Sequence, residues 1–527
     1  MTTPATFSAR VAGGFTVAWQ RLYAVLGQAS MYRVASGSLL ALWVLALALS
    51  FTGLIAPTWL ELIATLAVLL VACVVSNAIV QRMLRMPVRH ESSIITAGIL
   101  VFVVRPEVSL AGLGGIALAG VVAMVSKYVI AWRGRHILNP AAVGATVLTL
   151  TGLGYSAWWV GTPALAVPVI LFGFAVLVRT ERLRMVLAFL AIAVVTALVR
   201  DVVQSTQFGL APDPWGALSA ALWSGPLLFL GAFMLSEPLT LPPRRWQRLS
   251  VAAVVGVLAG WPIPLFGVIT LGQERALLIG NLVAFVWAAR GIVRLRFESD
   301  RMLTPSVREL TFRARRRLRF AAGQYIELEV PHAGADARGT RREFSISSAP
   351  ADLPAVRIAY RMQPETARES TYKKALLRAT PGGDYAATGI WGDFTLPRDT
   401  TMPLLLVAAG IGVTPFVSHL REAHARGERR DVVLVYVASS PAELAYRDEL
   451  AETGVPVVVF TREEPAELPA HWRWAGGTRL DAAGLQASVD DLAARHAFIS
   501  GPPALIADLA PALERARSLT TDAFAGY

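Results

Sequence analysis

Four short motifs in the second half of this 527-residue chain join residue types that suit the binding of phosphate and of flat rings. They are Arg342-Glu343-Phe344-Ser345, Gly410-Ile411-Gly412-Val413-Thr414-Pro415, Ser500-Gly501-Pro502-Pro503 and the terminal Tyr527. The glycine motif follows an apolar stretch and precedes a helical one, so its glycines permit a tight turn and a close backbone approach. The N-terminus of the following helix favours a pyrophosphate group. The pattern predicts a dinucleotide site that uses Gly410, Gly412, Thr414 and Pro415.

Two kinds of secondary structure surround these motifs. Residues 298–398 alternate in short strands separated by turn residues, which is typical of a small antiparallel β-barrel. The expected strands are Val307–Arg316, Gln324–Val330, Arg342–Ser347, Val356–Met362 and Tyr385–Phe394. Within residues 399–527, apolar strands alternate with helical stretches, which predicts a doubly wound α/β domain with a parallel sheet. Its expected strands are 403–408, 431–438, 455–460 and 497–500, and its expected helices are 414–427, 441–452 and 503–517.

Residues 36–293 are too apolar for a soluble domain. The whole chain is 54% hydrophobic with a mean hydropathy of +0.51, and the excess lies in this stretch. Its ten apolar segments are about 36–55, 58–80, 93–104, 110–132, 140–153, 163–178, 185–199, 217–235, 249–265 and 275–290. A straight crossing needs about 20 apolar residues, so two of the segments are short for one. We expect a multi-spanning α-helical membrane domain of about ten helices, preceded by an interfacial segment at residues 1–35 without a cleavable signal.

The arginines between these segments indicate the orientation of the chain. If residue 1 is cytoplasmic, the inside loops hold fourteen arginines and the outside loops hold three. The inside set is Arg82, Arg85, Arg89, Arg133, Arg135, Arg179, Arg182, Arg184, Arg244, Arg245, Arg248, Arg290, Arg294 and Arg296, and the outside set is Arg105, Arg200 and Arg275. This asymmetry predicts a multi-pass protein of the inner membrane with both termini in the cytoplasm. The net charge of +12 therefore indicates membrane topology and lipid contact rather than nucleic-acid binding.

Several redox groups are excluded by the residues that the chain lacks. Cys73 is the only cysteine, so the chain has no ligand set for an iron–sulfur cluster and no disulfide. A haem held between membrane helices needs paired histidines inside spans, and the nearest, His90 and His136, lie in expected loops. We expect no metal site. If the membrane domain carries electrons, a flavin or a quinone remains as the carrier.

Residues 298–527 resemble the ferredoxin–NADP reductase superfamily over their full length, on the four motifs above. The resemblance implies FAD and NAD(P)H as cofactors. It implies that Arg342 pairs with flavin phosphate, that Phe344 packs on the isoalloxazine and that Ser345 hydrogen-bonds the ring. The roles implied for the remaining motif residues are a second phosphate contact for Ser370 and Thr371, a nicotinamide loop for Ser500, Gly501 and Pro502, and stacking on the flavin for Tyr527. Ser345, Ser500 and Tyr527 are thus the expected catalytic residues, and Ser500 departs from the cysteine that is usual in the family.

The choice between NADH and NADPH depends on one arginine. Thr461-Arg462-Glu463 resembles the Ser-Arg pair that binds the 2′-phosphate in NADP-specific members. Ala438-Ser439-Ser440-Pro441 lacks the arginine that often serves the same purpose. Arg462 as a phosphate ligand favours NADPH, while Arg462 as a solvated surface charge leaves the choice open.

The membrane half also carries polar features. Lys127 lies within an expected span, where a charge is either functional or reaches the cytoplasmic interface with its long side chain. Residues 93–110 and 222–240 are each the third segment of a five-span half, and each ends in a Pro/Glu pair. Two odd-numbered halves invert their topology, so the pattern favours a 5+5 inverted repeat with interrupted helices.

Residues 30–293 resemble the D subunit of the Rnf complex and the B subunit of the Na⁺-pumping NADH:quinone reductase. The motifs behind this resemblance are Lys127, His136-Ile137-Leu138-Asn139-Pro140-Ala141, Ser224-Gly225, Gly231-Ala232-Phe233 and Glu237-Pro238. It implies a ten-helix fold related to urea transporters and a second flavin, FMN or riboflavin. Thr162 is the counterpart of the threonine that carries covalent FMN in those relatives. The acidic and Ser-Gly-Ala residues usual before that threonine are missing here, which argues against a covalent link and leaves non-covalent flavin open.

Together these features predict a transmembrane flavoprotein oxidoreductase. Electrons would pass from cytosolic NAD(P)H through FAD to a membrane flavin, and then to a quinone or an extracytoplasmic redox protein. Two other hypotheses stay open. One is an NAD(P)H:quinone reductase at the cytoplasmic face, for which the helices are an anchor. The other is a transporter or channel whose flavin domain senses redox state.

Overall fold

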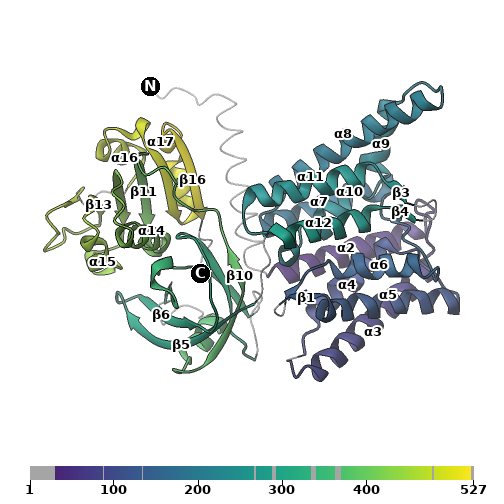
Figure 1. The fold of residues 1–527 in the computed structure, drawn as a ribbon, viewed down its shortest axis with the longest axis horizontal. Helices are drawn as coiled ribbons and strands as arrows, with labels where there is room; N and C mark the ends of the chain where they lie inside the picture. The colour runs from purple at the N-terminus through teal and green to yellow at the C-terminus, as the bar shows by residue number, and fades with distance from the viewer. Residues whose placement is uncertain are drawn as a thin grey trace. The chain divides into compact units, whose positions relative to one another are not determined.

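A computed structural model describes residues 30–86, 88–132, 135–265, 269–287, 292–333, 340–362, 370–476 and 480–523. The chain divides into two compact units, one of Val25–Gly291 and one of Ile292–Tyr527 together with Met1–Ala24 (Figure 1). The expected interfacial segment at residues 1–35 lies almost wholly outside the described residues, as does Tyr527.

The N-terminal unit is a bundle of helices with short connections. Its α-helices are α2 (Met31–Ser50), α3 (Trp59–Met83), α4 (Glu91–Val103), α5 (Leu110–Val129), α6 (Pro140–Leu150), α7 (Pro163–Thr180), α8 (Leu183–Gln207), α9 (Pro214–Trp223), α10 (Leu227–Phe229), α11 (Arg245–Gly260) and α12 (Gln273–Trp287). Two short hairpins, β1–β2 (Ala131–Trp132 and Arg135–His136) and β3–β4 (Ile263–Leu265 and Ile269–Leu271), connect helices. In the described residues, five helices are long and apolar enough to cross a membrane, or six if one bent pair is a single span. The expectation of about ten crossings exceeds this number and stays a prediction.

One helix of the bundle is broken in the second half of the unit. α9 and the helical stretch Leu227–Leu235 meet at an angle of 47°. Gly225 and Pro226 lie at the break, and the six residues Leu230–Leu235 that follow form a π-helix, η1. π-Helical turns are rare and occur often at functional sites. The residues expected to form an interrupted helix, 222–240, are thus interrupted.

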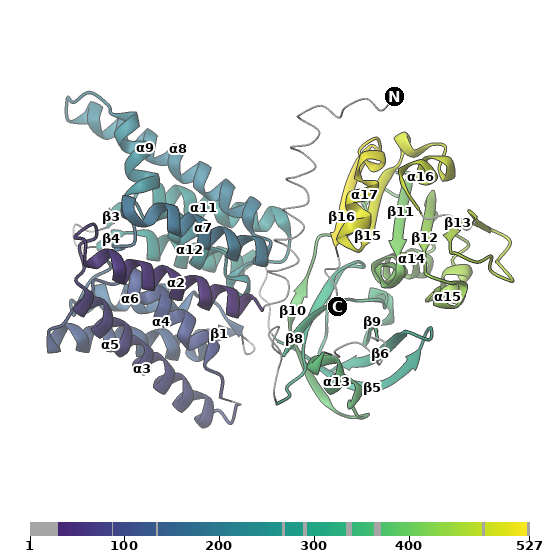
Figure 2. The ribbon, with the colours of Figure 1, turned by 180° about the vertical axis from the view of Figure 1, so that it is seen from behind.

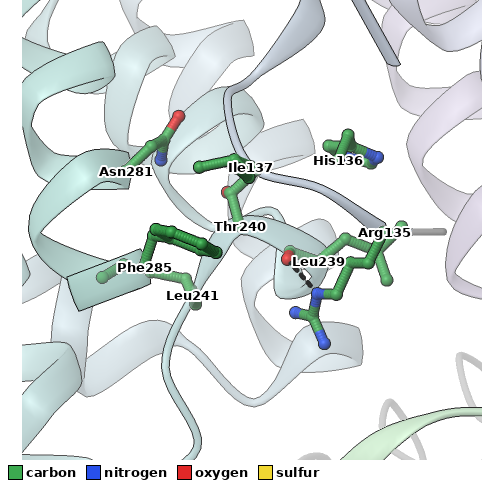
Figure 3. A pocket seen from close by; sticks show the side chains of 9 residues that line it. Arg135, His136, Ile137, Leu239, Thr240, Leu241, Asn281 and Phe285 are labelled. Atoms are coloured by element: carbon green, nitrogen blue, oxygen red, sulfur yellow. Dashed lines mark hydrogen bonds between the residues drawn. The ribbon is translucent and has the colours of Figure 1, made fainter. Parts of the chain in front are cut away.

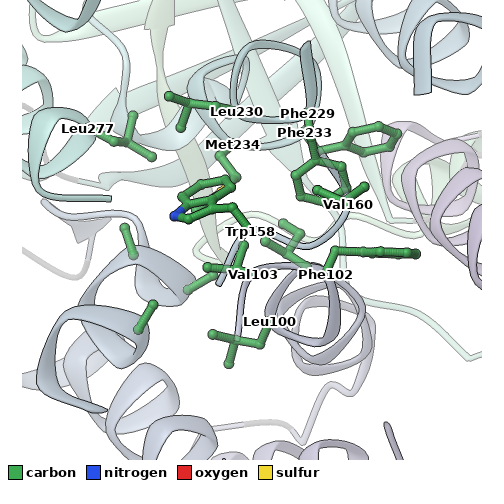
Figure 4. Close-up of a cluster of buried hydrophobic side chains, with 14 of the residues drawn as sticks. Leu100, Phe102, Val103, Trp158, Val160, Phe229, Leu230, Phe233, Met234 and Leu277 are labelled. Carbon is green, nitrogen blue, oxygen red and sulfur yellow. The ribbon is translucent and has the colours of Figure 1, made fainter. Parts of the chain in front are cut away.

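Large apolar side chains from the two halves of the bundle form its core. Figure 4 shows Phe102 and Val103 of the α4 end beside Phe229 and Phe233 of the broken helix, and Trp158 next to them. The rings of Phe102 and Phe229 lie 5.4 Å apart, and those of Phe229 and Phe233 lie 4.9 Å apart and stacked. Aromatic contacts of this kind contribute about 0.5–1.5 kcal/mol each beyond their burial. The ends of the two segments expected to correspond, 93–110 and 222–240, therefore meet in one core.

The C-terminal unit begins with an antiparallel barrel of six strands. They are β5 (Val293–Met302), β6 (Val307–Ala314), β7 (Tyr325–Glu329), β8 (Arg341–Ser345), β9 (Ala355–Arg361) and β10 (Asp384–Trp391), in the order β8-β7-β10-β5-β6-β9. An isolated bridge between Ile346 and Ile358 joins the two edge strands, β8 and β9. Alternation of buried and half-buried residues along β7 gives the barrel its apolar inner face. The sequence pattern predicted five of these strands; β5, rich in charged residues, was not among them.

The remainder of the unit is a parallel sheet covered by helices on both faces (Figures 1 and 2). Its strands are β11 (Leu404–Ala409), β12 (Val432–Val437), β13 (Val457–Phe460), β14 (Trp472–Trp474), β15 (His496–Gly501) and β16 (Ser518–Ala523), in the order β14-β13-β12-β11-β15-β16. The helices α14 (Thr414–Ala425) and α15 (Arg447–Glu452) pack on one face, and α16 (Ala482–Ser488) and α17 (Pro503–Leu513) pack on the other. Central β11 is apolar almost throughout because both of its faces are covered. The four expected strands are present, and β14 and β16 extend the sheet.

Candidate functional site

The chain reverses the direction in which it adds strands to the parallel sheet between β11 and β15. Two of the sequence motifs follow these two strands. β12, β13 and β14 extend the sheet on one side of β11, while β15 and β16 extend it on the other. A crevice forms outside the carboxyl ends of the strands at such a point, and ligands of doubly wound sheets bind there. Gly410–Val413 follows β11 as a 3-10 turn, and Ser500-Gly501-Pro502 ends β15 and leads to α17. The structure thus brings these two motifs together.

The two loops touch at Gly412. A Cβ atom placed on Gly412 would lie 2.3 Å from the Ser500 carbonyl oxygen, so only glycine fits this position. Gly410 has a φ of +53° and open space around it, so its requirement for glycine is conformational. Thr414 and Pro415 form the first turn of the twelve-residue helix α14, and Thr414 Oγ1 donates a hydrogen bond of 3.0 Å to the Ile411 carbonyl. The loop therefore presents bare backbone at the N-terminus of a helix, which suits a pyrophosphate group.

Ser500 carries a buried polar atom that fits a ligand in this crevice. Its side chain is fully buried at the end of β15, and its Oγ has no hydrogen-bond partner within the described residues. A buried hydroxyl without a partner costs about 1–3 kcal/mol. A nicotinamide carboxamide, which offers both a donor and an acceptor, would satisfy it. The observation supports the expected role of the Ser500-Gly501-Pro502 loop.

The second half of the site lies on the barrel strand β8. Arg342 and Phe344 are buried and Glu343 between them is exposed, because successive side chains of a strand alternate between its faces. Ser345 is buried as well, on the face opposite Phe344. The Ser345 side chain makes no hydrogen bond within the described part of the chain. A guanidinium, an aromatic ring and a hydroxyl thus share one short strand.

The short helix α13 (Thr371–Leu377) completes this group with a residue that the sequence motifs had not singled out. The guanidinium carbon of Arg342 lies 4.9 Å from the centre of the Tyr372 ring, and the Phe344 and Tyr372 rings are stacked at 6.1 Å. Tyr372 donates a hydrogen bond of 3.0 Å to the Leu328 carbonyl, which fixes the ring on the barrel. The signal for Tyr372 was its position directly after the expected phosphate contacts, Ser370 and Thr371. The structure places both segments together, and these residues fit a flavin dinucleotide.

Polar contacts across the barrel and the sheet hold the two half-sites in one arrangement. The carboxylate of Glu309 on β6 is buried and accepts a hydrogen bond of 2.8 Å from Tyr446, which precedes α15. Ser418 Oγ on α14 donates a hydrogen bond of 2.7 Å to the Ser348 carbonyl, just after the β8 motif. Burial raises the pKa of Tyr446 well above its ordinary value, and the nearby Glu309 charge raises it further, so the phenol stays protonated. These contacts position the flavin motif relative to the nucleotide loops.

His419 on α14 makes a third contact between the two domains. Its Nε2 lies 2.9 Å from the Phe394 carbonyl, which follows β10. Burial lowers the pKa of His419 to about 4, although the hydrogen bond with Phe394 opposes this shift. The imidazole is therefore neutral near pH 7, and its Nε2–H donates a hydrogen bond to the carbonyl.

The structure adds little about the roles of two other expected site residues, Arg462 and Tyr527. Arg462 is exposed directly after β13, beyond Thr461, whose hydroxyl donates a hydrogen bond of 2.8 Å to the Glu463 carbonyl. Its role in nicotinamide selectivity stays a prediction. Tyr527, the expected stacking residue, lies outside the described residues.

Lys127 and Thr162 of the bundle do not share a site in the described structure. Lys127 is in the last turn of α5, where its Nζ donates a hydrogen bond of 3.3 Å to the Ser92 carbonyl. Thr162 precedes α7 and lines a cavity of about 10 Å³ with Gly161, Trp223 and Gly225. Its Oγ1 is buried and has no hydrogen-bond partner among the described residues. A Cβ on Gly161 would lie 2.8 Å from the Gly225 backbone, so this loop packs directly on the broken helix.

A polar cluster that the sequence had indicated only as a motif lies elsewhere in the bundle. The Glu237 carboxylate is 2.9 Å from both His136 Nε2 and Asn139 Nδ2. A cavity of about 20 Å³ lies beside this cluster, and Figure 3 shows Arg135, Asn281 and Phe285 among its walls. The Asn281 amide nitrogen is buried without a partner in the described part of the chain. Glu237, the acidic residue of the Pro/Glu pair at residues 237–238, thus makes polar contacts within the bundle with His136 and Asn139.

Comparison with known proteins places residues 406–510 in the oxidoreductase NAD-binding domain family. The chain is 35% identical over 157 residues to ferredoxin–NADP reductase B of Sorangium cellulosum, which covers 29% of this chain and 62% of that protein. It is 30% identical over 220 residues to the heme-dependent oxidative N-demethylase beta subunit of Ectopseudomonas mendocina, and this match covers 41% of this chain and 63% of that protein. The chain thus spans about three fifths of the length of these curated relatives.

Two solved structures that align each cover 44% of the chain. The Amycolatopsis cytochrome P450 reductase GcoB aligns with a TM-score of 0.37 at 25% identity, covering 44% of this chain and 69% of that one. A ferredoxin NADP⁺ reductase from Neisseria gonorrhoeae with bound FAD and NADP aligns with a TM-score of 0.37 at 17% identity, covering 44% and 98%.

Residues 406–510 thus match the oxidoreductase NAD-binding domain, and the C-terminal unit is similar to NAD(P)H-dependent flavin reductases such as ferredoxin–NADP reductase. This similarity supports FAD and a nicotinamide dinucleotide as its cofactors. The resemblance of the N-terminal unit to the Rnf and Na⁺-pumping reductase subunits is not shown by these matches and stays a prediction.

Proposed function

We propose that the whole chain is a membrane-spanning flavoprotein that oxidises NAD(P)H on the cytoplasmic side and delivers electrons to an acceptor at the membrane. One observation carries the proposal. A single chain joins the nucleotide crevice at β11 and β15 to five helices that are long and apolar enough to cross a bilayer. Helices with such exposed apolar faces are stable in lipid rather than in water, which favours a membrane protein over a soluble reductase.

The residues of the C-terminal unit bind and orient the reactants. FAD, when bound, supplies the chemistry: it accepts a hydride from the nicotinamide and releases electrons singly or in pairs. Gly410, Gly412 and the first turn of α14 hold the pyrophosphate of the nicotinamide nucleotide. Ser500 orients the carboxamide, and Arg342 with Tyr372 holds the flavin phosphate. Ser345 hydrogen-bonds the flavin ring. Catalysis is mostly the positioning of two flat rings in a crevice that excludes water.

The acceptor that we propose is a redox protein or a quinone at the membrane. Related proteins include the reductase component of propane 2-monooxygenase from Mycolicibacterium goodii and the reductase subunit of aromatic O-demethylase from Amycolatopsis. Such names support electron delivery to a separate redox partner. The positive-inside arrangement of arginines supports a cytoplasmic site for NAD(P)H oxidation and a multi-pass inner-membrane protein.

Neither of the two cavities described in the bundle fits a second flavin, and of the residues predicted to hold one, only Thr162 lines a cavity. The cavity next to Thr162 measures about 10 Å³ and the cavity next to Asn281 about 20 Å³. Each has room for about one water molecule. An isoalloxazine ring does not enter either one, and Thr162 Oγ1 is buried. We therefore route no electron step through a membrane flavin. The same observation favours a second candidate function, a cytoplasmic-face NAD(P)H:quinone reductase whose helices serve as anchor.

A flavin inventory of the detergent-purified chain tests the proposal. The flavins are released with acid, identified as FAD or FMN by chromatography, and the denatured protein band is checked for in-gel fluorescence. One FAD per chain, together with NAD(P)H-dependent reduction of a water-soluble quinone, supports the proposed activity. A second flavin would show that the bundle opens to bind it and would favour a path across the membrane. A protein that retains no FAD contradicts the proposal.

A further inference from the structure

Several arginines lie together at one end of the barrel, on β5, on β6 and in the loop after β6. β5 and β6 are paired antiparallel, with Arg296 directly opposite Arg313. The Arg315 amide donates a hydrogen bond of 3.0 Å to the Arg294 carbonyl, so these two residues also face each other. Like charges directly across two strands destabilise a sheet. Such an arrangement lowers the free energy of unfolding unless an anion lies against it.

The loop that follows β6 continues this charge. Arg316, Arg317 and Arg319 are exposed, and none has a carboxylate within ion-pair distance in the described residues. Leu318 and Phe320, which alternate with them, pack against the barrel core. The apolar pair therefore fixes the loop and directs the guanidinium groups to solvent. We name Arg294, Arg296, Arg313, Arg315 and this loop the basic end.

Among the described residues, two carboxylates form ion pairs with this surface. Arg313 forms an ion pair with Glu298, and Arg315 Nη2 lies 3.0 Å from Asp384 Oδ1. Both pairs are about half exposed, and exposed pairs of this kind contribute at most about 1 kcal/mol. Asp384 is also the cross-strand neighbour of Arg296, so one carboxylate serves two arginines and the surface keeps a positive excess.

The position of the basic end in the sequence indicates what covers it. β5 begins at Val293, six residues after α12 ends at Trp287. Arg294 at the start of β5 accepts a backbone hydrogen bond from Arg315 just after β6, so the first residues of the barrel and the arginine loop lie at the same end of it. Clusters of four to eight basic residues that directly follow a cytoplasmic membrane end are attracted to anionic lipid headgroups.

We propose that the basic end binds anionic phospholipid headgroups of the cytoplasmic leaflet. This inference rests on the proposed function, because it requires the N-terminal unit to span the membrane. Guanidinium groups suit the phosphate of a lipid headgroup, since they donate two parallel hydrogen bonds. Bound headgroups offset the repulsion between Arg296 and Arg313 and restrain the barrel against the bilayer.

The test uses the full chain in nanodiscs of phosphatidylcholine, with and without phosphatidylglycerol. Deuterium uptake of residues 313–320 is measured by mass spectrometry at low and high salt. We expect severalfold slower uptake in the anionic discs, and we expect high salt to remove the difference. The triple variant R316Q/R317Q/R319Q should show the same uptake in both discs, because it keeps Leu318 and Phe320. The control R398Q/R429Q/R515Q removes equal charge from exposed sites outside the basic end and should behave as the wild type.

Equal uptake of the wild type in both discs overturns the inference, as does a control variant that abolishes the difference. Protection by added poly-L-glutamate but not by phosphatidylglycerol overturns it in favour of an acidic protein partner. Failure of the proposed function has a different signature. A chain that alkaline carbonate extracts from membranes does not span them, whatever its exchange pattern.

Discussion

The Tyr446 hydroxyl donates a hydrogen bond of 2.8 Å to the Glu309 carboxylate and so joins the NAD-binding sheet to the flavin-binding barrel. Both side chains are almost fully buried, at 2% and 1% exposure. Tyr446 also has a φ of +60°, which is rare for a residue with a side chain. Strain of this kind persists where surrounding contacts enforce it. Here the Glu309 contact fixes the orientation of the two domains that must present flavin and nicotinamide to each other.

Tyr446→Phe should therefore weaken the joint between the domains. The variant leaves a buried carboxylate without one of its donors, which costs about 1–3 kcal/mol. We expect a lower temperature of FAD release, followed by flavin fluorescence, and a lower kcat with little change in KM for NAD(P)H. Tyr385→Phe is the matched control, because Tyr385 makes no side-chain hydrogen bond in the described part of the chain. If both variants behave alike, the Glu309 contact does not position the domains.

Arg342→Gln should reduce FAD retention. The lost charged contact to flavin phosphate corresponds to roughly 1.5–3 kcal/mol, or about 10- to 100-fold in affinity. The FAD-to-protein ratio after gel filtration measures the effect, and added FAD should restore activity. Glu343→Gln changes the charge of the adjacent exposed residue and should retain FAD. Full FAD occupancy of Arg342→Gln would contradict the assigned phosphate contact.

Gly412→Ala should impair nicotinamide nucleotide binding more than Gly410→Ala does. The added Cβ of the first variant meets the Ser500 carbonyl oxygen at 2.3 Å and forces the two loops apart. The second variant meets open space and bears only the strain of a left-handed backbone, about 1–2 kcal/mol. KM for NAD(P)H with an artificial electron acceptor measures both. A KM for Gly412→Ala no higher than that of Gly410→Ala would show that the loop contact is unimportant.

Stability should fall in mild acid because of His419. Its pKa is lowered by burial to about 4, while the unfolded chain has a value near 6.5. The unfolded state therefore binds the extra proton between these values. The His419 contribution is complete above about pH 6.5 and is lost as the pH falls towards 4, by up to roughly 3 kcal/mol. His419→Gln keeps a donor for the Phe394 carbonyl and should flatten this dependence. Thermal release of FAD between pH 5 and 7.5 measures it, and identical slopes would exclude His419 as the cause.

Arg462→Ala should discriminate between the two nicotinamide nucleotides. If the guanidinium binds the 2′-phosphate, KM for NADPH should rise about tenfold, equivalent to roughly 1.4 kcal/mol, while KM for NADH stays constant. Arg429→Ala removes another exposed arginine as a control. Equal changes for both nucleotides would identify Arg462 as a solvated surface charge.

The sequence by itself determined the classes of structure and the local motifs. Alternation of apolar residues indicated the barrel strands, continuous apolar runs indicated the buried strands β11 and β12, and Gly410 and Gly412 marked the turn between a strand and a helix. These signals are local, since they depend on side-chain periodicity and backbone freedom within a few residues. The charged strand β5 and the short edge strand β14 carry weak local signals, and their pairing with neighbours decides their conformation.

Only the tertiary structure decided which distant residues meet. Tyr372 lies under Arg342 because α13 packs on the barrel, and Ser500 touches Gly412 because β11 and β15 are neighbours in the sheet. Glu309 and Tyr446 are 137 positions apart in the chain, so no local pattern connects them. The separation of Lys127 from Thr162 likewise follows from helix packing. Burial and long-range pairing depend on how elements fold against one another, and a local sequence pattern does not contain that information.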